Sequence, residues 1–278
     1  MNTILVPTDF SKNADKALQY GIAIAKKENA KIILVHALDI PLSIQYNSSF
    51  LLERKLSVME EDARIRLKIS CIEIEKLKIE CEFLNNPGAT VDVIMKAAQK
   101  KKADLIVMGT KGKGGIPEVL IGSNTSRIIE KARCPVIAVP PSAKFNGLHK
   151  ITYATDYNTL EIRSVKEVVE IAKKFNAKIT MLHVSDRKTD KTSEKKLLDD
   201  FMKKLKRQIK FIKIAYKLAF GVNLQSALEK HLKLESPDLL VMTTKHRNLF
   251  EKIFSPSITK RMAFHSRIPL MAFHHARK

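Results

Sequence analysis

The sequence contains little of several residue types that would narrow its function. None of its 278 residues is tryptophan, 6% are aromatic, and no Lys/Arg run alternates with Phe or Tyr. A groove for single-stranded nucleic acid stacks bases on such aromatic side chains, so this class is disfavoured. No apolar stretch approaches the roughly 20 residues that a helix needs to cross a bilayer, which argues against a membrane-spanning protein.

Cysteine is also scarce, with three residues at positions 71, 81 and 134. Their spacing matches no Cys-x-x-Cys or paired metal-binding pattern. Because Cys71 and Cys134 lie among apolar residues, we expect buried free thiols in a reducing compartment. The chain enters a strand-like run directly at Met1, without a basic leader. The sequence therefore predicts a cytoplasmic location.

Acidic residues are outnumbered, 29 against 50 Lys and Arg, so the formal net charge is +21. Most of this excess lies after residue 146. Such a charge attracts polyanions, anionic lipid or acidic proteins. The alternative, which we favour, is that lysines scattered over helix faces keep the chain soluble. The Lys-rich pattern from Lys195 to Lys213 predicts a helix that packs its apolar side on a sheet.

What the sequence does contain is an internal repeat, found as four matching segments in the same order. It predicts two similar domains, residues 1–142 and 148–278, joined near Pro140–His149, where Pro, Asn and Gly are typical of a linker. The matched pairs are Ile4–Asp9 with Ile151–Asp156, Ile32–His36 with Ile179–His183, Asp104–Thr110 with Asp238–Thr244, and Cys134–Val139 with Ile268–Phe273.

Within each copy, short apolar runs alternate with longer amphipathic patterns. Strands alternating with helices of this length predict an α/β fold with a parallel sheet covered on both faces. Ser11 is the expected N-cap of the first helix. The expected strands are Thr3–Val6, Lys31–Ala37, Lys78–Leu84, Asp104–Met108, Val136–Val139, Lys150–Thr155, Lys178–Val184, Ile214–Leu218, Asp238–Met242 and Leu270–Phe273. The expected helices of the first copy are Asp15–Lys27, Leu51–Ile74, Thr90–Lys100 and Ser123–Ala132.

A glycine-rich segment follows the fourth strand, with Gly109, Gly112 and Gly122 in a fixed frame and Ser123 directly after. Strand, glycine-rich loop and helix present backbone N–H groups and a helix N-terminus to a phosphate. We expect Gly109 to leave room for a ligand at the strand end. Asp9 follows the first strand, and ligands of such sheets bind at the carboxyl ends of strands. Asp9 would accept from a ribose hydroxyl or hold a divalent metal.

The glycines and the histidines also allow other interpretations. The glycines could simply form a flexible loop, and neither GxxxxGK[ST] nor an early GxGxxG is present. No Ser/His/Asp or Cys/His arrangement supports nucleophilic catalysis. His274 and His275 lack a third ligand, so no metal site is predicted. We expect His36 and His183, which recur at corresponding strand ends, to be structural.

Four segments together resemble the universal stress protein family: V-P-T-D at the start, D-L-I-V-M-G-T before the loop, G-x2-G-x9-G-S, and C-P-V-I-A-V at the end of the first copy. The resemblance covers essentially the whole chain as two tandem domains. It implies five-stranded parallel α/β sandwich domains, Rossmann-like and similar to the adenine nucleotide α-hydrolase fold. It also implies ATP binding, with or without Mg²⁺, where the glycine motif is kept.

The resemblance also implies the positions of the ligand contacts. Those expected to border adenosine are Pro7, Thr8, Asp9 and Val35, with Val35 placed at the end of the second strand. Those expected to contact phosphate and ribose are Met108, Gly109, Gly112, Gly122, Ser123 and Asn124. In the second copy Thr243, His246 and Pro256 replace the three glycines and only Ser257 is kept, so one nucleotide per chain is predicted.

The resulting hypothesis is a cytoplasmic stress-response or regulatory protein that binds ATP in its first domain without efficient turnover, so no catalytic residue is assigned. The resemblance implies pairing through the terminal strands, Val136–Val139 and Leu270–Phe273, as a pseudo-dimer within the chain, with a homodimer and an unidentified protein partner left open. Two alternatives remain: slow ATP hydrolysis, and a polyanion- or lipid-binding module formed by the basic second half.

Overall fold

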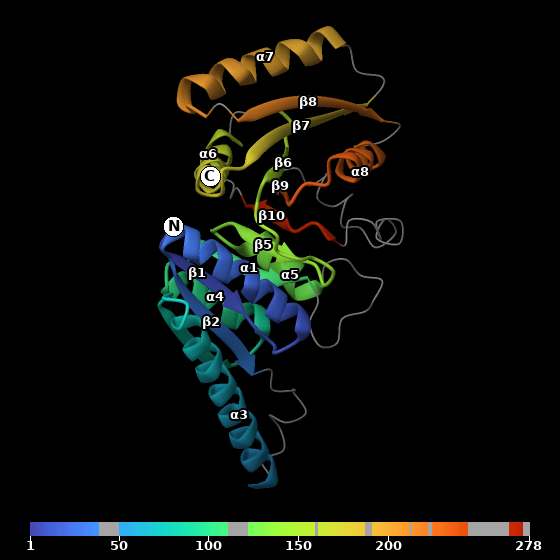
Figure 1. Ribbon diagram of the computed structural model, residues 1–278. Helices are drawn as coiled ribbons and strands as arrows, with labels where there is room; N and C mark the ends of the chain where they lie inside the picture. The colour runs from blue at the N-terminus through green and yellow to red at the C-terminus, as the bar shows by residue number, and fades with distance from the viewer. Residues whose placement is uncertain are drawn as a thin grey trace. The chain divides into compact units, whose positions relative to one another are not determined.

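The computed structural model describes residues 1–38, 50–110, 122–158, 161–186, 191–211, 213–221, 224–243 and 267–274. The chain divides into two compact units, the first extending to Pro141 and the second beginning at Ser142. Within the described residues, each unit contains five parallel strands in one sheet, with helices connecting them (Figure 1). The repeat in the sequence therefore corresponds to a repeated α/β fold, as predicted.

The N-terminal unit has the strand order β3-β2-β1-β4-β5. All residues of β1 and β5 are buried, as expected for strands covered on both faces of a parallel sheet. Its elements are β1 (Thr3–Pro7), α1 (Lys12–Glu28), β2 (Lys31–Leu38), α3 (Phe50–Glu75), β3 (Cys81–Pro87), α4 (Thr90–Lys100), β4 (Leu105–Gly109), α5 (Ser123–Lys131) and β5 (Val136–Val139).

The C-terminal unit repeats this arrangement with the strand order β10-β9-β6-β7-β8. Among the residues that the structure describes, no helix is both long and apolar enough to cross a membrane. The elements of this unit are β6 (Lys150–Ala154), α6 (Glu161–Phe175), β7 (Lys178–Asp186), α7 (Lys191–Gln208), β8 (Ile214–Gly221), α8 (Leu224–Glu235), β9 (Leu239–Thr243) and β10 (Leu270–Phe273).

The order of the strands fixes where a ligand can bind. In the N-terminal unit, β2 and β3 continue to one side of β1, whereas β4 and β5 continue to the other. Right-handed crossovers then place α1 and α3 on one face of the sheet and α4 and α5 on the opposite face. The carboxyl ends of β1 and β4 lie side by side, because Leu5 pairs with Ile106. This reversal point is where open α/β sheets bind ligands.

Several element boundaries differ by three or more residues from the sequence expectation, among them those of β3 and α7. Strand β3 begins at Cys81 rather than at Lys78. Lys78 instead adopts a left-handed conformation, with φ of 62°, and its N–H donates to the Glu75 carbonyl at 2.8 Å. Helix α7 ends at Gln208 and does not continue to Lys213. Its apolar side is nevertheless buried, as predicted, at Phe201 and Leu205.

The expectation of buried free thiols at Cys71 and Cys134 is wrong for Cys71, whereas Cys134 is a free thiol of intermediate exposure. Cys71, on the buried side of α3, is joined by a disulfide to Cys81 at the start of β3. Their Cα atoms are 5.3 Å apart, within the range that a disulfide spans. The short turn after α3 brings the two residues together, although ten positions separate them in the sequence. The bond links α3 to the edge strand of its sheet.

His231, on α8, makes the stability of the C-terminal unit dependent on pH. Its side chain is buried, and its Nε2 lies 3.4 Å from the Thr152 hydroxyl. Burial lowers the pKa of His231, and the Lys217 ammonium lowers it further, while the Glu235 carboxylate opposes both. As the pH falls through 6.5, the ordinary pKa of histidine, His231 therefore takes up a proton more readily in the unfolded chain than in the folded chain.

We expect the C-terminal unit to lose stability as the pH falls below about 6.5, until the lower pKa of the folded state is reached. Replacing His231 with glutamine, which does not titrate, is expected to flatten this dependence. Hydrogen exchange of the α8 amides between pH 5 and 8, corrected for the intrinsic exchange rate, measures the effect locally. An equal acid-induced loss of protection in His231→Gln and in the parent would contradict the assignment.

Candidate functional site

The register of the sheet gathers most of the predicted site residues at one edge of the N-terminal unit. Pro7 ends β1, so Thr8 and Asp9 follow at the carboxyl edge. Met108 and Gly109 end the neighbouring strand β4. Gly112 lies outside the described residues.

Val35 differs from its expected place at a strand end. It is buried within β2, which continues to Leu38, and it pairs with Pro7. Its carbonyl accepts the Thr8 N–H at 2.8 Å. Val35 therefore also supports the turn that leads from β1 to the edge.

The turn between β1 and α1 is held by its own side chains. The Thr8 hydroxyl oxygen accepts the Phe10 N–H, and the Asp9 carboxylate accepts the Ser11 N–H, both at 3.0 Å. These bonds accommodate Phe10 in the left-handed region, at φ of 59°. Ser11 accepts the Ala14 N–H at 3.2 Å and caps α1, as predicted. The position of Asp9 is thus fixed by local hydrogen bonds.

His36 also belongs to this turn, in agreement with the structural role expected from the sequence. Its Nδ1 lies 2.8 Å from the Thr8 carbonyl oxygen, and its ring lies 4.7 Å from that of Phe10. Because a carbonyl only accepts, Nδ1 must carry the proton. His183 makes the same contact with Thr155, at 2.7 Å, in the C-terminal unit. A bond present in both units serves the shared fold.

Gly109 also lies in close contact with a neighbouring helix. A Cβ at this position would lie 2.5 Å from Nδ2 and 3.0 Å from Cγ of Asn13, on α1. The space that a Cβ at position 109 would occupy is therefore already filled by Asn13 of α1. A side chain at position 109 would disturb the packing of α1 on β4 whether or not a ligand binds.

Hydrogen bonds join the end of β4 to the start of α5. The Gly122 N–H donates to the Thr110 carbonyl at 2.7 Å, and the Thr125 hydroxyl donates to the Gly109 carbonyl at 2.9 Å. A Cβ on Gly122 would lie 3.1 Å from the Thr110 carbonyl oxygen, which is closer than usual. These contacts hold the N-terminus of α5 beside the carboxyl ends of β1 and β4.

The N-terminus of α5 is arranged differently from those of α1 and α4. Gly122 occupies the N-cap position, where no side chain bonds to the helix, and the first turn contains no acidic residue. By contrast, Asp15 lies in the first turn of α1 and Asp92 in that of α4. Ser123 and Asn124 are exposed. The positive end of α5 therefore lacks a carboxylate from its own first turn and can accept an anion.

The corresponding edge of the C-terminal unit contains a carboxylate of its own. Glu161, aligned by the repeat with Ala14, is buried and accepts from the Thr155 hydroxyl and, at 3.4 Å, from the Asp156 N–H. Thr243 stands in place of Gly109 and is also buried. Sequence reasoning missed Glu161. The available signal was its position on the apolar side of α6, four and seven residues before Val165 and Val168.

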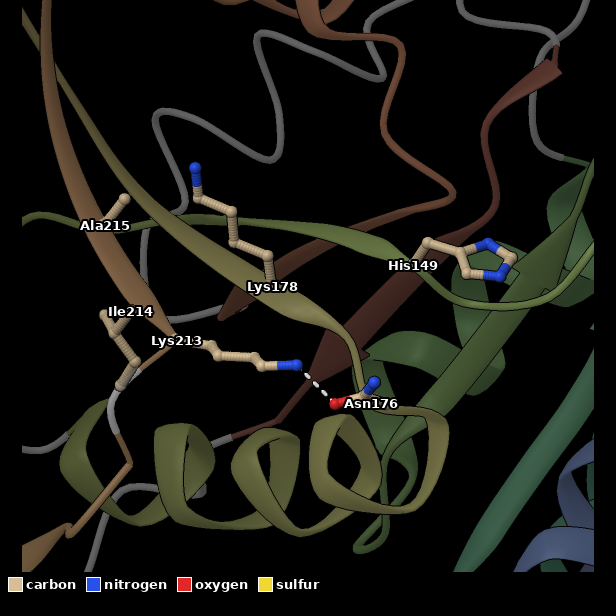
Figure 2. Close-up of a pocket in the computed structure, with 6 residues that line it drawn as sticks. All are labelled: His149, Asn176, Lys178, Lys213, Ile214 and Ala215. Carbon is tan, nitrogen blue, oxygen red and sulfur yellow. Dashed lines mark hydrogen bonds between the residues drawn. The ribbon is translucent and has the colours of Figure 1, made fainter.

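A pocket of about 420 Å³ lies elsewhere in the C-terminal unit. Figure 2 shows the residues that line it, with Lys213 donating to Asn176. Lys178 and Ile214 are the first residues of β7 and β8, so the pocket lies at the amino ends of these strands. Ligands of open α/β sheets bind at the opposite ends. The lining residues are His149, Asn176, Lys178, Lys213, Ile214 and Ala215.

The fold, together with the carboxyl edge of the N-terminal sheet, defines a Rossmann-like α/β protein with two tandem domains. The chain belongs to the universal stress protein family, whose model matches residues 1–140 and 147–274. Universal stress protein MJ0531 of Methanocaldococcus jannaschii is 33% identical over 147 residues, which cover 51% of this chain and 83% of that protein.

Solved structures give the same result for the fold. A universal stress protein from Archaeoglobus fulgidus DSM 4304 has a TM-score of 0.72 and 20% identity, covering 99% of this chain and 97% of that one. At this identity the likeness establishes the fold alone. A universal stress protein solved in complex with cAMP is 25% identical and covers 51% of this chain and 98% of that one, with a TM-score of 0.37.

Proposed function

We propose that the protein binds ATP in its N-terminal domain, residues 1–142, and acts as a nucleotide-dependent stress-response or regulatory protein in the cytoplasm. The N-terminus of α5 carries this proposal, because it has neither a capping side chain nor an acidic first turn and follows β4 at the strand reversal point. An ATP phosphate group would supply the negative charge that this helix end lacks.

The described residues fit such a ligand. The backbone N–H groups of Ser123 and Asn124, which have no acceptor within the helix, would bind the phosphates. Gly122, whose own N–H donates to Thr110, would leave room beside them, and the sequence motif assigns Gly112 to the same phosphates. Met108 and Gly109 would line the ribose side. The carboxylate of Asp9 would accept from a ribose hydroxyl or bind Mg²⁺, which would neutralise phosphate charge. Pro7, Thr8 and Val35 would border the adenosine.

The C-terminal domain, residues 148–278, is proposed to bind no nucleotide at the equivalent edge. The Glu161 carboxylate already accepts from Thr155 and Asp156, and its charge would repel a phosphate. The side chain of Thr243 adds bulk where the first domain has glycine. We assign this domain the role of a partner to the first, in a pseudo-dimer that pairs through the terminal strands.

Calorimetric titration of the purified chain with ATP tests the proposal. The expected stoichiometry is one nucleotide per chain. Mass spectrometry of ligands released on denaturation identifies what the protein carries from the cell, and an adenine nucleotide is expected. Two equivalent sites would contradict the assignment to one domain, and no binding of any adenine nucleotide would contradict the function.

The site is expected to bind ATP without efficient turnover. Asp9 is the carboxylate that the proposal places at the ligand, where it would bind a ribose hydroxyl or Mg²⁺ and would not activate water; its Oδ1 also accepts the Ser11 N–H. Phosphate release is expected well below about 1 per second, the low end of typical enzymes. A faster rate that disappears in Asp9→Asn would assign the protein to the ATPases instead.

A further inference from the structure

Helix α3 is apolar on two opposite sides. One side packs on the sheet and buries Ala63, Leu67 and Ile74 together with the disulfide residue Cys71. At 100° per residue, a second apolar row lies on the opposite side. We call this row the outer stripe; it consists of Val58, Ile65, Ile69 and Ile72, which are 63%, 46%, 55% and 43% exposed.

Exposed apolar side chains are concentrated at this helix. Six of the nine large ones among the described residues lie between Val58 and Leu77. Single exposed apolar residues are ordinary, whereas a contiguous apolar patch of a few hundred Å² marks an interaction surface. In Figure 1, the N-terminal part of α3 extends beyond the sheet of its own unit.

The repeat provides a comparison within the same chain. Helix α7 occupies the equivalent place after the second strand of its unit and buries Phe201 and Leu205 on one side. Its opposite side is polar and exposed, with Lys196, Asp199 and Lys203. The fold therefore does not require an apolar outer side on this helix. Of these two equivalent helices, α3 has an apolar outer side and α7 does not, which favours binding over a scaffold role.

The charges beside the outer stripe are arranged with opposite signs on the two sides of its midpoint, Ile65. Residues 60–64 contain Glu60, Glu61, Asp62 and Arg64, with a net charge of −2, whereas residues 66–70 contain Arg66 and Lys68, with a net charge of +2. In an antiparallel pair of α3 helices with Ile65 facing Ile65, the acidic segment of one copy would lie opposite the basic segment of the other, with Glu61 and Lys68 on the same flank. A parallel pair would align residues of the same sign.

Four of these charged side chains also form exposed ion pairs within the helix. Arg64 pairs with Glu61 at 2.7 Å and Arg66 with Asp62 at 2.9 Å. Lys68 forms no ion pair within the part of the chain that the structure describes, so it is available to a partner. The charge pattern thus complements a second copy of the same helix.

We propose that the outer stripe is a homodimer interface in which the α3 helices of two chains pack antiparallel. This interface is separate from the nucleotide site and does not depend on the proposed function. Four side chains bury less than the roughly 800 Å² per partner of a standard stable interface. The dimer is therefore expected to be weak, with a Kd on the order of micromolar.

Sedimentation velocity of the full chain between about 1 and 200 μM tests the proposal around that affinity. The parent is expected to shift from monomer to dimer with concentration, and Ile69→Glu to remain monomeric with an unchanged unfolding midpoint. The matched control is Leu197→Glu on α7, where the parent side chain is 56% exposed; it is expected to dimerise like the parent. A monomeric parent over this range, or a dimer that survives Ile69→Glu, would overturn the proposal.

Crosslinking tests the antiparallel orientation. With Ile65 at the two-fold axis, Ile65→Cys is expected to form a disulfide with its own copy. Val58→Cys is expected to crosslink with Ile72→Cys but not with itself. Self-crosslinking of Val58→Cys in preference to the mixed pair would rule out this orientation. Binding to anionic phosphatidylserine vesicles by a monomeric parent, lost in Ile69→Glu, would assign the stripe to a lipid surface and overturn the dimer.

Discussion

Replacing Ser123 with aspartate is expected to weaken ATP binding at least tenfold while leaving the fold intact. The new carboxylate would stand in the first turn of α5, where the proposed phosphates bind. Like charges about 4 Å apart repel by about 4 kcal/mol near a protein surface, and salt screening lowers this. A tenfold loss corresponds to about 1.4 kcal/mol. Because an acidic first turn favours a helix, the variant should unfold no more easily than the parent.

Two controls distinguish the effect of the added charge from that of side-chain size, and the contribution of the phosphates to affinity from that of the adenosine. Ser123→Asn has a similar size without the charge and is expected to bind ATP within about threefold of the parent, less than a full tenfold step. Adenosine, which lacks phosphates, should bind Ser123→Asp and the parent equally. Calorimetry measures all five affinities: ATP with the parent and both variants, and adenosine with the parent and Ser123→Asp. Equal ATP affinity in Ser123→Asp and the parent would show that the phosphates do not bind at the N-terminus of α5. The main support for the proposed site would then be lost.

Ser123 is a better test position than the glycines. A larger residue at Gly109 would contact Asn13 at 2.5 Å, so a loss of binding there would not distinguish ligand contact from displaced packing. Ser123 is exposed and bears no such constraint.

Reduction of the Cys71–Cys81 disulfide is expected to lower the free energy of unfolding of the N-terminal unit by about 2–3 kcal/mol, the chain-entropy value for a loop of this length. The bond fixes α3 against β3 and restricts the unfolded chain between them. Denaturant unfolding with and without dithiothreitol, monitored by hydrogen exchange in α3, measures the change. Cys81→Ala should reproduce the reduced state.

Cys134 provides the matched control, because it is not part of the disulfide. Cys134→Ala should retain the full response to dithiothreitol. If the reductant leaves the stability of the parent unchanged, the two thiols are not bonded in solution.

Hydrophobic patterning was sufficient to predict the repeated α/β fold, because runs such as Ile32–Val35 are apolar on both faces and suit only a covered parallel strand. The start of β3 was misplaced since a left-handed lysine, Lys78, ends the preceding turn where glycine or asparagine is usual. Such a choice depends on the tertiary position of α3 and leaves no local sequence signal.

Long-range contacts explain the rest of what the sequence did not reveal. The pairing of Cys71 with Cys81 depends on which side of α3 faces β3. The role of Gly109 depends on Asn13, from a distant helix. Gly109, Gly122 and Asp9 were nevertheless predicted to lie near one edge, since in a parallel sheet all strands end on the same side.

The buried carboxylate of Glu161 has a thermodynamic consequence for the two halves of the chain. Under the proposed function, free ligand stabilises the first domain by RT ln(1 + [L]/Kd), so its resistance to unfolding follows the supply of nucleotide in the cell. In the second domain the polypeptide itself supplies the acceptor to Thr155 and Asp156. Under the same proposal, the stability of that domain would not depend on the supply of nucleotide.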